Sequence, residues 1–239
     1  MNIPGEEHAI TSNEFFELEE VPKRTLVVGG GYIAIELSQI LASLGSDVSI
    51  LVRRCILSTF DQELAGYQME NLEKSGVEFI CGELTKIVKN SDGSLTVTRK
   101  NGKTQTVDCV LVAVGRIGNI EKLNLKNTDV QFDHNGIIKV DEYENTTATG
   151  VYAIGDVGGN TALTPVAIRS GRTLAERLFN NRPGLKVDYS YIPSVIFSHP
   201  PIGSIGLSEE QAIETYGSDN LNIYRTSFTS KFSSFMYDF

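Results

Sequence analysis

The pattern of apolar residues is clearest where the chain leaves an acidic, irregular opening and begins a buried run at Thr25. Residues 25–28 read as a short buried strand that the glycines at 29–31 interrupt. Helical spacing then predicts a helix whose buried stripe is Ile33, Leu37, Ile40, Leu41 and Leu44. A second β-branched run fills 47–52 after Gly45, so residues 25–52 predict a strand–turn–helix–strand unit.

The pattern changes further along the chain. Residues 61–75 predict a helix and 77–81 a third strand. From 84 to 106 the chain alternates and carries two turn signals, around Asp92-Gly93 and Asn101-Gly102, which favour an antiparallel meander. Further strands are expected at 108–114, 150–154, 194–197 and 221–228, and further helices at 165–179 and 208–216.

Composition narrows the class of protein. The chain has 239 residues, of which 41% are hydrophobic and 21% charged, enough for a sizeable core. A net charge of −9 argues against nucleic acid or an anionic membrane as a partner, and no segment approaches the ~18 apolar residues of a membrane span. The acidic first twenty residues argue against a signal or transit peptide. A cytoplasmic location is therefore expected, with a precursor processed upstream of Met1 as the alternative.

The cysteines offer no redox or metal motif. Cys55, Cys81 and Cys109 lie 26 and 28 residues apart, so none of the usual CxxC, zinc or secreted disulfide spacings occurs. We expect reduced, mostly buried thiols and no metal site.

The first motif with chemical content is the GxGxxA loop formed by residues 29–34. The first glycine makes a tight turn, the second lets a pyrophosphate approach the backbone, and the small third residue packs helix on strand. The helix that follows offers free N–H groups to the anion. A purely structural turn is the alternative, but the surrounding strand–helix–strand unit favours dinucleotide binding.

The second motif selects the nucleotide. Where an NAD site usually places an acid on the ribose 2′-hydroxyl, the second strand ends in Arg53-Arg54. Guanidinium groups suit a 2′-phosphate, so the pair predicts NADP; a solvated basic pair is the alternative.

Two Gly-polar pairs, Gly115-Arg116 and Gly155-Asp156, also follow predicted strands, where ligands meet an open α/β sheet. Each can equally be a plain turn. Thr164-Pro165, at the start of the next predicted helix, can likewise be only a helix cap with proline in the first turn.

Six motifs follow one another along the chain, at residues 29–36, 53–54, 113–116, 152–156, 163–167 and 198–203. In this order they resemble the flavoprotein pyridine nucleotide–disulfide oxidoreductases, and most of all the glutathione reductases, over residues 3–229. Thioredoxin and trypanothione reductases are the alternatives, while the arginine pair disfavours the NAD-using dihydrolipoamide dehydrogenases.

The resemblance implies an α/β fold in three parts. Residues 1–118 would form a Rossmann-like NAD(P)-binding domain with an antiparallel meander, behind a lead-in segment at 1–22. Residues 119–189 would be the returning, C-terminal part of a FAD-binding domain. Residues 190–239 would be the truncated start of an α+β dimerisation domain.

The resemblance also implies roles for single residues. NADPH would be held by Gly29, Gly31, Ile33, Arg53, Arg54, Gly115 and Arg116. Tyr32 would cover the flavin. Gly155, Asp156, Leu163 and Thr164 would contact FAD, Glu36 would support the flavin site, and Arg172 would bind a glutathione carboxylate. The plainer alternatives are a half-buried tyrosine at a helix start for Tyr32, a surface glutamate favoured by the helix dipole for Glu36 and an exposed basic residue for Arg172.

The implied reaction passes hydride from NADPH through FAD to a redox disulfide, which then reduces glutathione disulfide, in a homodimer of the full-length family. This chain carries neither the redox cysteine pair nor the catalytic histidine of that family, so no catalytic residue is assigned and the chain is expected to be an incomplete form, inactive alone. A non-catalytic NADPH-binding module and an interaction protein are the alternatives.

Three further details depart from the family or concern the chain's end. Ser58 replaces a third phosphate-binding arginine, which weakens the expected preference for NADPH, and Arg169 replaces a common alanine. The aromatic tail at 227–239 predicts concentration-dependent association.

Overall fold

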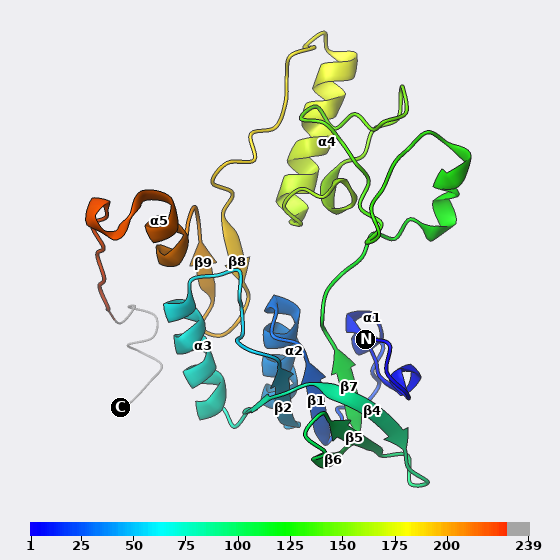
Figure 1. Cartoon of the computed structure of the whole chain (residues 1–239), viewed down its shortest axis with the longest axis vertical. Helices are drawn as coiled ribbons and strands as arrows, with labels where there is room; N and C mark the ends of the chain where they lie inside the picture. The colour runs from blue at the N-terminus through cyan, green and yellow to red at the C-terminus, as the bar shows by residue number, and fades with distance from the viewer. Residues whose placement is uncertain (229–239) are drawn as a thin grey trace. The chain divides into compact units, whose positions relative to one another are not determined.

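A computed structural model of the chain describes residues 1–228. The chain divides into two compact units, Met1–Gly206 and Leu207–Phe239. The first unit is an α/β structure built on a parallel sheet (Figure 1). The predicted boundaries near 118 and 189 both fall inside this unit and stay predictions.

The parallel sheet carries the core of the first unit. Its strand order is β3 (Glu78–Cys81), β2 (Asp47–Val52), β1 (Arg24–Val28) and β7 (Cys109–Val112). On one face, α2 (Tyr32–Ser43) and α3 (Gln62–Lys74) contribute to a buried cluster that includes Val27, Ile50 and Leu111. The strand–turn–helix–strand unit predicted from the sequence is therefore confirmed.

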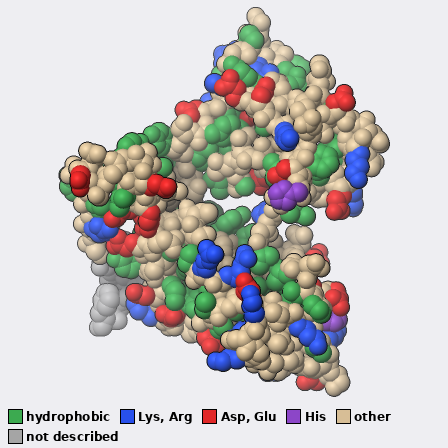
Figure 2. Space-filling view, in the orientation of Figure 1, with side chains coloured by type: hydrophobic (Ala, Val, Ile, Leu, Met, Phe, Trp, Pro, Cys, Tyr) green, Lys and Arg blue, Asp and Glu red, His purple; other side chains and the backbone are tan. Residues whose placement is uncertain are grey.

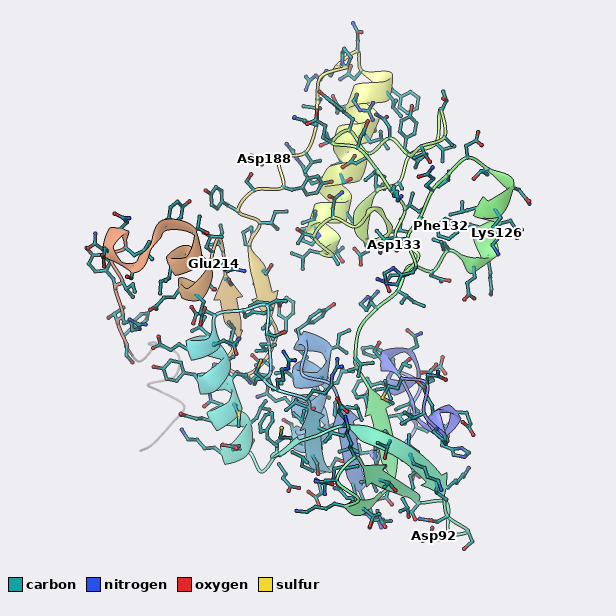
Figure 3. The ribbon with its side chains drawn as sticks, viewed as in Figure 1. Asp92, Lys126, Phe132, Asp133, Asp188 and Glu214 are labelled. Atoms are coloured by element: carbon teal, nitrogen blue, oxygen red, sulfur yellow. The ribbon has the colours of Figure 1, made fainter. Side chains whose placement is uncertain are left out.

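The opposite face of the sheet is covered by the predicted meander. Strands β4 (Leu84–Lys89), β5 (Leu95–Arg99) and β6 (Thr104–Val107) pair antiparallel in that order. Their inward residues join Leu26 and Val110 in a second buried cluster. The turn between β4 and β5 carries Asp92 at its tip (Figure 3).

The lead-in segment is part of this architecture. A short 3₁₀ turn, η1 (Glu6–His8), precedes Ile10, which forms a parallel bridge with Leu111 of β7. The Ile10 N–H donates to the Val110 carbonyl and the Ile10 carbonyl accepts from Val112 N–H, both at 2.8 Å. The helix α1 (Ser12–Phe15) then starts at a capping box formed by Thr11 and Glu14.

The predicted stripe of α2 was only partly right. Ile40 and Leu44 are 44% and 61% exposed, whereas Ala34 and Ser38 are fully buried. The buried face of α2 mixes small, large and polar side chains: Ala34, Ile35, Leu37, Ser38, Gln39 and Leu41. A pattern of large apolar residues alone therefore misplaces its edges.

Residues 119–189 are held differently. Three 3₁₀ turns, η2 (Glu121–Leu123), η3 (Leu125–Asn127) and η4 (Gly155–Gly158), precede the long helix α4 (Thr164–Phe179). The predicted strand at 150–154 is wrong: only Tyr152 forms a bridge, to Asn145. Its neighbours bond to loops instead, since Ala153 N–H donates to the Glu144 carbonyl and Val151 accepts from Thr146 N–H.

A two-stranded hairpin completes the first unit. Strands β8 (Ser194–Ile196) and β9 (Ile202–Ser204) flank a cis His199-Pro200 peptide bond, and both Ile196 and Ile202 enter the cluster on the helix side of the sheet. The sequence did not predict β9, because two prolines and Gly203 give a three-residue strand the appearance of a turn.

The second unit contains α5 (Glu209–Tyr216), which begins at a Ser208–Gln211 capping box, and the 3₁₀ turn η5 (Ser218–Asn220). The predicted strand at 221–228 is wrong, because these residues form no ladder within the described part of the chain. The expected behaviour of the aromatic tail depends on residues 229–239, which lie outside the described residues.

Basic and acidic side chains are interspersed on the face drawn in Figure 2. None of the helices within residues 1–228 has the length and apolar character needed to cross a bilayer. The cytoplasmic location stays a prediction.

Candidate dinucleotide-binding site

Gly29 ends β1 in a conformation that only glycine adopts easily. Its φ is +133°, and its N–H donates to the Leu51 carbonyl at 3.0 Å. A Cβ at this position would lie 2.2 Å from the Ala113 carbonyl oxygen. The first glycine of the loop is therefore required by the close approach of the segment that follows β7.

Gly31 faces open space instead. It is the N-cap of α2 and provides no capping side chain, and no heavy atom of the described residues would lie within 4 Å of an added Cβ. The first N–H groups of a helix have no partner inside the helix, so this end of α2 can accept an anion. Ala34, fully buried, packs the same helix onto the sheet. The three small residues thus occupy the three environments that the motif predicts.

The arginine pair lies at the same edge of the sheet. Arg53 and Arg54 follow β2 directly and both are exposed. The loop behind them returns to the glycine turn, because Leu57 N–H donates to the Gly30 carbonyl at 2.6 Å. Asp61 then caps α3 by accepting from Glu63 N–H at 3.0 Å. This loop fixes the backbone that presents the two guanidinium groups.

A third segment completes this edge. Ala113 N–H donates to the Val28 carbonyl at 2.8 Å, which keeps the chain after β7 beside β1 as far as the glycine turn. Gly115 has a φ of +146° with open space around it, and Arg116 is exposed. In the first turn of α2, Tyr32 is 42% exposed and Ile33 packs partly against the core. The structure therefore brings the predicted NADPH residues together at the carboxyl ends of parallel strands.

The side of α2 is occupied by the segment that links β8 to β9. Glu36 accepts the Phe197 N–H at 2.8 Å. Gln39, largely buried, accepts the His199 N–H at 2.7 Å and donates to the His199 carbonyl at 2.6 Å. Sequence reasoning missed Gln39, since a single glutamine on a helix gives no local signal for a backbone partner so distant in the chain.

The residues expected to contact FAD and substrate lie around η4 and α4. Gly155 is buried with a φ of +67°, and an added Cβ would lie 2.9 Å from Ala167 Cβ. Asp156 and Thr164 are exposed, while Leu163 is the N-cap of α4 and its side chain makes no capping bond. Arg172 is exposed further along α4. The helix start is as predicted, with proline in the first turn, but Thr164 is its first residue and not its cap.

The cysteines correct one expectation. Cys55 and Cys81 are exposed, because one lies in the loop after β2 and the other ends the outermost strand β3. Cys109 is buried in β7, and burial, reinforced by the nearby Asp108 charge, raises the pKa of its thiol to about 11. Residues 1–228 contain no group of three or more His, Cys, Asp or Glu side chains suited to a metal.

Comparison with known sequences decides the family. The profile described as "Pyridine nucleotide-disulphide oxidoreductase" matches residues 1–171. The chain belongs to this family. The profile of the family's dimerisation domain matches residues 192–238. The chain also shares 40% identity over 230 residues with a glutathione reductase of Schizosaccharomyces pombe, covering 95% of this chain and 50% of the relative.

Solved structures of flavoprotein disulfide reductases have the same fold. The HOCl-induced flavoprotein disulfide reductase RclA from Escherichia coli matches with a TM-score of 0.82 and 27% identity, and its Cu(II) complex with a TM-score of 0.84 and 27% identity. Each match covers 90% of this chain and 50% of the other. The chain thus spans about half the length of the relatives it matches.

Proposed function

We propose that this oxidoreductase chain binds NADPH and forms the nucleotide-binding part of a glutathione-disulfide reductase. The observation that carries the proposal is the open backbone at Gly31, on an uncapped helix end, with Arg53 and Arg54 at the same sheet edge. The similarity to the Schizosaccharomyces pombe glutathione reductase supports the substrate.

The chain's own groups suit the parts of NADPH in turn. The first N–H groups of α2 would hold the pyrophosphate, and Gly29 and Gly31 let it approach the backbone. Arg53 and Arg54 would pair with the 2′-phosphate, for which a guanidinium fork is well suited. Gly115 and Arg116, after the neighbouring strand, would close the far side, and Ile33 would line the ribose. Tyr32 would cover the flavin in the absence of the nicotinamide.

The remaining assignments extend the proposal to FAD and substrate. Gly155, Asp156, Leu163 and Thr164 would contact the flavin, with Glu36 as support, and Arg172 would pair with a glutathione carboxylate. When bound, the two cofactors supply hydride transfer and disulfide reduction. The three proposed parts are residues 1–118, 119–189 and 190–239, of which the last would contribute to a homodimer.

We expect binding without turnover from this chain alone. Its three cysteines are widely spaced, and His199 donates its backbone N–H to Gln39 beside a cis proline, in a motif unlike that of the family's acid–base histidine. A non-catalytic NADPH-binding module is therefore the second candidate, and a related thioredoxin or trypanothione reductase the third.

Calorimetric titration with NADPH and with NADH tests the proposal. We expect saturable binding that favours NADPH, and a loss of about ten- to a hundredfold in NADPH affinity in the double variant R53M/R54M, with NADH affinity little changed. K126M, at an exposed lysine of η3 (Figure 3), is the control for lost charge. Equal NADPH affinity in wild type and R53M/R54M would refute the role of the arginine pair.

A further inference from the structure

A carboxylate, that of Glu83, lies near the proposed 2′-phosphate site, in the short link between β3 and β4, and the arginines follow the neighbouring strand β2. Val52 of β2 pairs with Cys81 of β3, and Gly82 N–H donates to the Val52 carbonyl at 2.8 Å. The Cys81 thiol lies 3.6 Å from the Arg53 carbonyl oxygen. Because paired strands lie about 4.8 Å apart, Glu83, two residues after Cys81, begins close to the Arg53-Arg54 pair.

Glu83 is held by a second basic residue from the meander. Lys100, just after β5, places its ammonium 2.8 Å from Glu83 Oε2 and donates its backbone N–H to the Glu83 carbonyl at 2.9 Å. The Lys100 hydrogen bond and charge lower the pKa of Glu83, and the charge of Arg53 lowers it further. Glu83 therefore stays ionised at neutral pH, within electrostatic range of both cations.

We propose that Glu83 sets how strongly this site prefers NADPH over NADH, and that Lys100 limits its influence. The inference rests on the proposed NADPH function. A carboxylate near Arg53 competes with the 2′-phosphate for the guanidinium and repels it. NADH has a hydroxyl there, which can donate to a carboxylate, the arrangement that NAD sites usually build at the end of the second strand.

Lys100 acts through Glu83 in this proposal. While its ammonium pairs with the carboxylate, part of the negative charge is neutralised and Arg53 remains available to the phosphate. Glu83 thus adds to the effect already expected from Ser58, which offers no positive charge in the loop after β2.

The test is the ratio of NADPH to NADH affinity, measured by calorimetry at low salt on the full chain. We expect E83Q to raise this ratio about two- to fivefold and K100M to lower it by a similar factor, the range of exposed charge pairs. The double variant E83Q/K100M should match E83Q, because Lys100 has no carboxylate left to neutralise. All differences should shrink at about 1 M salt, where the Debye length is ~3 Å.

Matched controls come from the other end of the meander. D92N removes a negative charge at the β4–β5 turn (Figure 3), and K89M removes a positive charge at the far end of β4; both should leave the ratio unchanged. Circular dichroism verifies folding of each variant.

The outcomes separate the two proposals. A wild-type chain that binds neither nucleotide would overturn the proposed function and the role of Glu83 with it. Wild-type binding with the same ratio in E83Q and K100M would overturn only the role of Glu83, leaving a plain surface ion pair. A further fall in the ratio when K100M is added to E83Q would show that Lys100 contacts the phosphate directly.

Discussion

Residues 24–112 and residues 119–189 satisfy the hydrogen-bonding groups of their backbone in two different ways. In the first region, parallel and antiparallel ladders pair the strands, and two large apolar clusters pack the sheet from both sides. In the second region, the residues before α4 form isolated bridges and 3₁₀ turns, and they contain one small cluster of four buried residues. Strand ladders and apolar packing hold the first region, whereas individual side chains hold the loops of the second.

Those side chains are identifiable. Asp133, labelled in Figure 3, accepts from the N–H groups of Asn135 and Ile137, both at 2.9 Å. Asp141 accepts from the backbone of Tyr143 and Asn145. Arg177 donates to the Tyr143 carbonyl and lies over the Tyr143 and Tyr152 rings. Removing one such side chain should therefore open one loop locally. A destabilising substitution in the sheet should instead promote unfolding of the whole sheet.

The largest effect is expected at the first glycine of the loop. G29A would force a Cβ to within 2.2 Å of the Ala113 carbonyl, so we expect a loss of about 1–3 kcal/mol in unfolding free energy and no NADPH binding. Urea unfolding and calorimetry measure the two. G31A is the matched control: its φ of −79° and open surroundings predict near wild-type stability with impaired binding. Similar unfolding curves for G29A and wild type would contradict this account.

The second effect concerns the hairpin on the side of α2. Q39L would leave the N–H and carbonyl of His199 without their partner, at a cost of about 1–3 kcal/mol. Hydrogen exchange at the His199 amide should accelerate together with the loss of stability. I40Q, at the exposed neighbouring position, should have little effect. An I40Q variant as unstable as Q39L would indicate that Ile40 belongs to the buried stripe, as the sequence predicts.

A third, smaller effect is expected at high pH in the parallel sheet. The pKa of the buried Cys109 thiol is about 11, above its ordinary 9.0, so folding favours the neutral form. The unfolded chain therefore loses its proton first, and stability should fall as pH rises from 9 to 11, by about 1 kcal/mol at pH 10. C109A removes this titrating thiol, so the difference in unfolding free energy between C109A and wild type should change between pH 9 and 11.

Thiol counting provides the control for this prediction. At pH 8 a disulfide reagent should modify two thiols quickly, those of Cys55 and Cys81, and the third only on unfolding. Three fast thiols would place Cys109 at the surface and remove the basis of the pH effect.

The smallest effect is local to the second region. D141A should speed hydrogen exchange about tenfold at the amides of Tyr143 and Asn145, with the amides of β1 unchanged. Exchange spectra of D141A and wild type measure this directly. Faster exchange in β1 as well would mean that the two regions unfold together, and that the loops of the second region do not open independently.

The sequence predicted what local chemistry decides. The glycine loop, the strands of the parallel sheet and the meander turns all follow from residues close together in the chain. The failures are set by the folded surroundings of a residue: the exposure of Ile40, the absence of a ladder at 150–154 and the hydrogen bonds of Gln39 to the distant His199. Cys55 and Cys81 belong to the same class, since their exposure depends on a loop path and a strand edge.

The bridge at Ile10 has a consequence for the molecule outside the nucleotide site. By filling hydrogen-bonding positions along β7, the N-terminal segment denies this strand to the strands of other molecules. Proteolytic removal of the first twenty residues would uncover a ready template for intermolecular strand addition. The acidic segment thus protects the edge of β7 against aggregation. Its loss should first cause precipitation at high protein concentration.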